Sequence, residues 1–117
     1  MDLDKQIGKV EFYQRLLAEM VSEERFSFYR LVIEKGLSEA EMQEVIQVVT
    51  ELDQQFEEQK EMGYIHFSSL LVHFAGMLNP KLKPYEAIQA LKSQGICVNL
   101  METLMPLAYE ATLWDKK

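Results

Sequence analysis

The residues with the greatest capacity for chemistry are His66, His73 and Cys97. Imidazole groups bind metals and transfer protons near neutral pH, and a thiol that meets a histidine in the fold can act as a nucleophile. Both histidines lie in residues 64–80, YIHFSSLLVHFAGMLNP. Seven residues on a helix are almost two turns, so the pair would point the same way but lie about 10 Å apart. Helical zinc ligands stand three or four residues apart, so we expect no joint chelation.

The histidines instead fall at the edge of a predicted buried face. Steps of 100° per residue place His66, His73 and Met77 beside an apolar arc, while the arc itself contains Phe67, Leu70, Leu71, Phe74 and Leu78. Amphipathic residues at such an edge pack with the apolar part inward and the polar tip in water. We therefore predict packing histidines, with a binding or pH-sensing role as the alternative.

Cys97 lies in the segment QGICVNLME, which contains no cationic neighbour that would lower its pKa. We expect a small, buried, unreactive side chain. A single cysteine excludes an internal disulfide and indicates a reducing compartment. The alternative is that the fold gathers Cys97 with His66 and His73 into a small-molecule or metal site, with or without enzymatic activity.

The remaining polar residues match no catalytic or metal-binding motif. The carboxylates of residues 51–61 lack the Glu-x-x-His pattern of di-iron bundles and the spacing of a calcium loop. A cluster of this kind is typical of a solvated helix surface. Phosphate-binding glycine loops and the nucleophile elbow are missing from the sequence as well. We predict no catalytic residues, no cofactor, no metal and no enzymatic activity.

Composition restricts the class of protein further. The 117 residues suit one domain over 1–117, and 48% of them are hydrophobic, as in ordinary globular proteins. A net charge of −7 without a basic run argues against binding to nucleic acid. The longest aliphatic run is residues 70–72, far below the ~20 residues of a membrane span, and the first residues show no secretory signal. We expect a cytoplasmic protein without membrane contact.

Helix start and stop signals divide the chain into five to six helices. Apolar residues recur at three- to four-residue steps over residues 3–21, Ser22 can cap a second helix, and Gly36 can end it. Ser38 and Glu41 have the spacing of a capping box, which predicts a third helix that runs toward Gly63.

The second half of the chain contains three more predicted helices. The fourth covers about residues 66–78 and ends before Pro80. Pro84 fits the first position of the fifth, which buries Ile88 and Leu91 and closes at Gly95. The last spans about residues 98–113, where Pro106 should kink it or divide it in two. No segment alternates like a strand, so the predicted class is all-α and compact.

Two helices are larger than a lone domain of this size requires, which indicates self-association. Leu3, Val10 and Leu17 stand seven residues apart, as in a coiled-coil seam, and the third helix approaches 36 Å. A tryptophan near a chain end usually docks on another surface. We predict a homodimer. Its candidate contact residues are Leu3, Ile7, Val10, Leu17, Leu113 and Trp114.

Three segments resemble one protein family. They are IEKGLSEAE, GYIHFSSLLVHFAGMLNPKL and YEAIQALKSQGICVNLME. Together with FYQRLL in the first helix, they are similar to the YhaI-like proteins of Bacillus and relatives across nearly the whole chain. The resemblance implies a compact, multihelical, cytoplasmic bacterial protein. It implies no activity and no site residues, because the family has no assigned function.

The sequence thus favours a non-enzymatic interaction or regulatory protein that self-associates. Such a protein would bind a protein partner through an apolar groove or through the acidic face of the third helix. The alternative remains the small-molecule or metal-binding protein that uses His66, His73 and Cys97.

Overall fold

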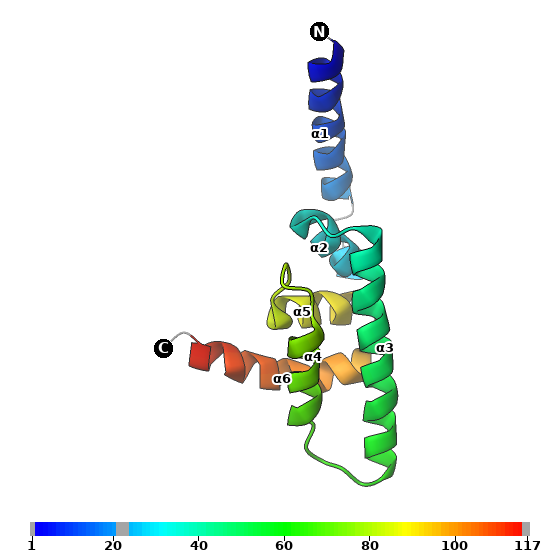
Figure 1. The fold of residues 1–117 in the computed structure, drawn as a ribbon, viewed down its shortest axis with the longest axis vertical. Helices are drawn as coiled ribbons and strands as arrows, with labels where there is room; N and C mark the ends of the chain where they lie inside the picture. The colour runs from blue at the N-terminus through cyan, green and yellow to red at the C-terminus, as the bar shows by residue number, and fades with distance from the viewer. Residues whose placement is uncertain (1, 21–23, 116–117) are drawn as a thin grey trace.

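The computed structural model describes residues 2–20 and 24–115, and this part of the chain contains six α-helices, one short 3₁₀ helix and no strand. The helices are α1 (Asp2–Met20), α2 (Ser27–Lys35), α3 (Glu39–Glu61), α4 (Ser68–Met77), α5 (Pro84–Gln94) and α6 (Val98–Asp115), and the 3₁₀ helix η1 covers Glu24–Phe26. Helices α3 and α4 run side by side in opposite directions, and α5 and α6 lie across them (Figure 1). The predicted all-α class is confirmed.

Helix α5 lies at the centre of the body that α2–α6 form. It packs against both α2 and α6, and Ala87, Ile88 and Leu91 are completely buried. Helix α6 contributes a buried row from its first three turns, which consists of Leu100, Met101, Leu104 and Ala108. Each fully buried aliphatic side chain of this kind stabilises the fold by roughly 1.5–3 kcal/mol relative to an exposed one.

The long helix α3 supplies the opposite wall of the core. Its buried residues recur at helical steps of four, three and four and are Val45, Val49, Leu52 and Phe56. Helix α4 covers them with Leu70 and Phe74, and Phe67, Leu71 and Leu78 pack against the same core. Phe56 and Phe67 meet edge to face with ring centroids 4.9 Å apart, which closes the end where α3 passes to α4. The predicted buried face of the fourth helix is therefore confirmed.

Local sequence signals explain where most helices begin and end. The Ser38 Oγ accepts a hydrogen bond from the Glu41 N–H, and the Glu41 carboxylate accepts one from the Ser38 N–H, so the predicted capping box is present. Pro84 opens α5 as expected. Gly36 and Gly95 end α2 and α5 with φ of 69° and 86°, a left-handed conformation that side chains with a Cβ rarely adopt.

Three details differ from the sequence expectations. Helix α6 continues through Pro106, with Leu104 and Ala108 buried on either side of it, so of the two expected outcomes the division into two helices is wrong. Helix α4 begins at Ser68, so His66 precedes the helix and does not share its angular register with His73. Helix α2 begins at Ser27, and the cap expected at Ser22 lies outside the described residues.

Helix α1 projects from the body along the long axis of the molecule (Figure 1). The radius of gyration is 17.0 Å, compared with about 13 Å for a compact chain of this length. The molecule measures 64 × 33 × 24 Å, and α1 accounts for about 28 Å of helix length. None of the helices in the described part is apolar over enough turns to cross a bilayer.

We predict that Ile88→Ala lowers the free energy of unfolding by about 2–5 kcal/mol, because it removes completely buried atoms and leaves a cavity beside α2 and α6. Ile65→Ala is the matched control, since Ile65 is 78% exposed and the change should stay within about 0.5 kcal/mol. Urea unfolding followed by circular dichroism measures both. Equal losses for the two variants would contradict the central place of α5.

Candidate functional site

The most prominent surface of the molecule is an apolar face on α1. Eight large apolar side chains of this helix are between 41% and 73% exposed, namely Leu3, Ile7, Val10, Phe12, Tyr13, Leu16, Leu17 and Met20. We call these eight residues the α1 face. Monomeric proteins rarely expose so much contiguous apolar area, and such patches commonly mark interaction sites.

The α1 face has an ordered arrangement along the helix. Leu3, Val10 and Leu17 form one row at seven-residue spacing, and a second row three residues further on contains Tyr13 and Met20. Rows at positions i and i+3 of each heptad are the a and d positions of a coiled coil. Ile7 and Leu16 flank the two rows on opposite sides, about 90° from the centre of the seam. The arrangement fits a second helix laid along α1.

Charged residues occupy the other side of α1. Glu11, Arg15 and Glu19 fall opposite the seam at 100° per residue. The Arg15 guanidinium lies 5.7 Å from the centroid of the Phe12 ring, which is seven residues before Glu19 and so lies on this same side of the helix. The helix carries both signs of charge in nearly equal number, which suits association better than a face of one sign.

Helix α1 gains little stability from its own sequence. Most of the stability of helices in proteins comes from packing of their apolar face, and Gly8 within α1 costs about 1 kcal/mol relative to alanine. A Cβ added at Gly8 would meet no neighbouring atom within 4 Å, so close packing in this chain does not explain the glycine. A surface that covered its apolar side chains would stabilise this helix.

The structure does not bring the three candidate chemical residues together. His66 and His73 are both exposed, one before α4 and one on its outer side. Cys97 precedes α6 and packs against the core. The open hollow between α2 and α5 is lined mainly by polar residues, and none of the three candidates lines it. Within the described ranges, no group of three or more His, Cys, Asp or Glu side chains is placed to hold a metal ion.

The environment of Cys97 disfavours the reactive thiolate. Burial raises the pKa of the Cys97 thiol, and the negative charge of Asp53 raises it further. The residue also has a φ of 47°, which is uncommon for a side chain with a Cβ. A nucleophilic cysteine needs the opposite electrostatics, because the thiolate is the reactive form.

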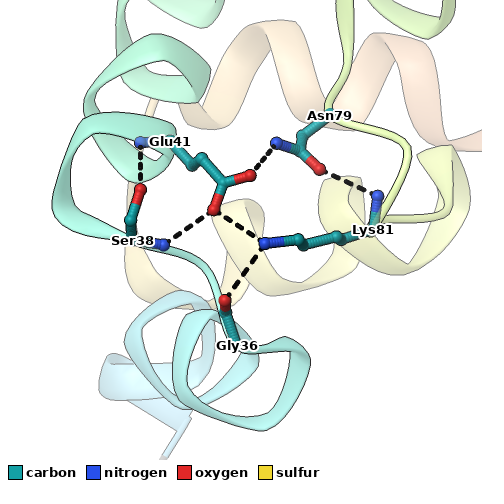
Figure 2. Close-up of polar contacts among 5 residues, drawn as sticks. All are labelled: Gly36, Ser38, Glu41, Asn79 and Lys81. Atoms are coloured by element: carbon teal, nitrogen blue, oxygen red, sulfur yellow. Dashed lines mark hydrogen bonds and ion pairs between the residues drawn. The ribbon is translucent and has the colours of Figure 1, made fainter.

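A polar cluster around Glu41 ties two loops to the start of α3 (Figure 2). One Glu41 oxygen accepts hydrogen bonds from the Ser38 N–H and the Lys81 ammonium, both at 2.9 Å, and the other accepts one from the Asn79 amide at 2.8 Å. Lys81 also donates to the Gly36 carbonyl at 3.3 Å. The hydrogen bond from Lys81, followed by those from Ser38 and Asn79, lowers the pKa of Glu41 from 4.5 to about 2. The donors and acceptors of the cluster satisfy each other, so its role is structural.

The sequence alone indicated part of the α1 face and part of the Glu41 cluster. The seven-residue spacing located Leu3, Val10 and Leu17. Leu16 on the flank and Phe12 on the far side went unassigned, although their apolar character was the available signal. Asn79 was identified only as a helix stop, and no local pattern pairs it or Lys81 with Glu41 about 40 residues away. Leu113 and Trp114 lie on α6, but their side chains are outside the described residues.

Residues 1–108 match the model of a family described as "Protein of unknown function (DUF1878)". The match covers most of the chain, so the protein belongs to this family. The expectation of an uncharacterised domain family is confirmed.

We predict that Glu41→Gln destabilises the fold at neutral pH and has little effect near pH 2. A carboxyl whose pKa is lowered on folding stabilises the native state above its ordinary pKa, and this contribution is lost as pH falls from about 4.5 to about 2. Glu44→Gln on the exposed side of α3 serves as the control and should change stability little at either pH. Urea midpoints at the two pH values test this; a loss that is independent of pH would contradict it.

We also predict that Cys97 reacts more slowly with iodoacetamide at neutral pH in the folded protein than in urea. Burial and the Asp53 charge both reduce the thiolate fraction in the fold. Intact-mass measurements over time give both rates. Faster alkylation of the folded protein would restore Cys97 as a candidate nucleophile.

Proposed function

We propose that this member of the DUF1878 family is a non-enzymatic interaction or regulatory protein that self-associates through the α1 face. The observation that carries the proposal is the helix that projects from the body (Figure 1), because eight of its large apolar side chains are exposed. Covering them would stabilise both the helix and the assembly, because apolar burial contributes roughly 25 cal/mol per Å².

A second copy of the chain is the occupant that the α1 face fits best. The seam is regular enough for knobs-into-holes packing, and a two-fold dimer lets one surface cover its own equivalent. The other large exposed surface, the outside of α3, is unsuited to self-pairing. Helix α3 carries eight carboxylates against one lysine, a formal charge of −7 that equals the net charge of the whole chain. Two such surfaces would repel each other.

The acidic side of α3 is then the surface that a different protein would contact. Glu44, Glu51, Glu57, Glu58 and Glu61 are all exposed along it. A partner with a basic surface fits this charge, and the association would weaken as salt rises. We place the protein in the cytoplasm and among the YhaI-like proteins as part of the same proposal, on the basis of its single cysteine and the three similar segments.

The self-association proposal is tested by molar mass and by a matched pair of valine substitutions. Light scattering of the wild type should give twice the mass of one chain. Val10→Glu puts a charge in the seam of both copies, and the loss of two buried valines should raise the dissociation constant at least about 100-fold. Circular dichroism should also lose helix signal, because α1 unfolds when it is uncovered.

Val72→Glu is the control, since Val72 is 71% exposed on α4, away from α1. This variant should keep the mass and helix content of the wild type. A wild-type mass equal to one chain at high micromolar concentration would overturn the proposal, and so would equal effects of the two substitutions.

A further inference from the structure

We infer that the outer surface shared by α3 and α4 binds a basic amphipathic helix of a different protein. The inference rests on the proposed role of the acidic side of α3 and names the kind of partner that would contact it. It follows from an uncharged, exposed face on α4, from a row of glutamates on α3 beside that face, and from the positions of the basic residues in this chain.

Helix α4 presents an uncharged surface to solvent. Residues 62–80, which include all of α4, contain no Asp, Glu, Lys or Arg, although these four types make up 26% of the whole chain. Outside α1, eight large apolar side chains are exposed in the described part of the chain, and five of the eight lie in this segment. The five are Met62, Tyr64, Ile65, Val72 and Met77. Exposed apolar patches of this kind commonly mark interaction sites.

The exposed residues of α4 have the spacing of a helix-packing face. Ser69, Val72, His73, Gly76 and Met77 stand at positions i, i+3, i+4, i+7 and i+8, and all five are exposed. We call these five residues the α4 outer face. A Cβ added at Gly76 would meet no neighbouring atom within 4 Å, so packing within the subunit does not explain this glycine. The small residues at positions 69 and 76 allow a helix of another molecule to approach closely.

A row of glutamates runs along α3 next to α4. Glu41 accepts a hydrogen bond from Asn79, just after α4, and Val48 is partly buried seven residues further along the same side of α3. The residues three positions after 41, 48 and 55 lie about 60° further from the buried stripe of α3, and all three are exposed. We call these residues the glutamate row, which consists of Glu44, Glu51 and Glu58.

The glutamate row and the α4 outer face adjoin each other. Helices α3 and α4 run side by side and bury their apolar stripes in one core (Figure 1). The flank of α3 toward α6 is the opposite one, because Asp53 on that flank lies close enough to Cys97 for its charge to act on the thiol. The sides of α3 and α4 that are turned away from the core therefore form one surface, acidic on α3 and uncharged on α4.

A helix with one basic side and one apolar side fits both parts of this surface. Successive glutamates of the row are seven residues apart, about 10 Å along a helix, so Lys or Arg residues at the same spacing on a helix beside α3 would meet them. The apolar side of that helix would cover the α4 outer face.

A second copy of this chain does not supply such a helix. Two glutamate rows would repel each other, so the surface cannot pair with its own equivalent. The sequence also contains no two Lys or Arg residues seven positions apart, so none of its own helices offers the complementary basic row. The occupant is therefore a different protein.

The inference is tested with two fluorescent peptides of about 21 residues, long enough to form helix on binding. One peptide carries Arg at every seventh position with Leu and Ala on the adjoining side, and the other carries the same residues in scrambled order. Fluorescence anisotropy at moderate salt should show binding of the first peptide and little binding of the second.

Two double variants of α3 test the glutamate row. Glu51→Gln with Glu58→Gln should weaken binding of the first peptide about tenfold, because two charge pairs are lost. Glu57→Gln with Glu61→Gln is the matched control, since it removes the same charge from α3 outside the row, and it should change the affinity less than about twofold. Equal binding of the two peptides, or equal effects of the two double variants, would overturn the inference.

Gly76→Gln tests the α4 outer face. Its side chain would stand where the peptide approaches, so the affinity should fall about tenfold. Circular dichroism should report an unchanged fold, because the position has room for a side chain. Full binding by Gly76→Gln would overturn the inference and still leave the acidic side of α3 as a partner surface. Val10→Glu should bind the first peptide as the wild type does, so a failure of self-association through α1 would not alter this result. A mass of one chain for Val72→Glu would show instead that the α4 outer face joins copies of this chain, which would also overturn the inference.

Discussion

Burial of α5 is the interaction on which the rest of the body depends. Its completely buried residues Ala87, Ile88 and Leu91 fill the space between α2 and α6, and α6 in turn contacts α3 and α4. The short side chain at position 87 allows close approach of the neighbouring helix, while the two larger residues fill the core. The body of α2–α6 therefore has a core of its own, and the described buried residues all lie outside α1. That independence is the reason why the apolar face of α1 needs an explanation outside the subunit.

The Glu41 cluster acts at the rim of this core, where backbone turns leave polar groups in need of partners. The turn after α2 and the loop before α5 both approach the first turn of α3 (Figure 2). A carboxylate at that position is favourable for the N-terminus of α3 and supplies acceptors for both loops. The pKa of Glu41 is low because several hydrogen-bond donors converge on its carboxylate. The acidic charge of α3 is thus used structurally at its first turn and remains exposed along the later turns.

The sequence predicted the parts of the fold that depend on short spacings. Capping residues, glycine stops and the apolar steps of α3 and α4 act within one or two helical turns, so they are visible in the chain itself. The continuity of α6 through Pro106 accompanies burial of Leu104 and Ala108 against residues far along the chain, which no local pattern shows. The Glu41 cluster was invisible for the same reason. In the candidate site, the periodicity of apolar residues located the seam of α1. The exposure of that seam could be known only from the structure, in which α2–α6 pack together and α1 projects from them.

The contrast between α1 and α3 also supports different roles for the α1 face and the acidic side of α3. Both helices are long, but α3 buries a full stripe of four residues and presents charge, while α1 presents apolar residues along its seam and keeps mixed charge opposite it. Apolar burial is strong and short-ranged and favours lasting contact between identical surfaces, whereas a surface of one sign acts over distance and excludes its own copy. A chain with these two surfaces can self-associate through α1 and still present the acidic side of α3 to a different partner. Such a division requires no catalytic residue, which agrees with the scattered positions of His66, His73 and Cys97.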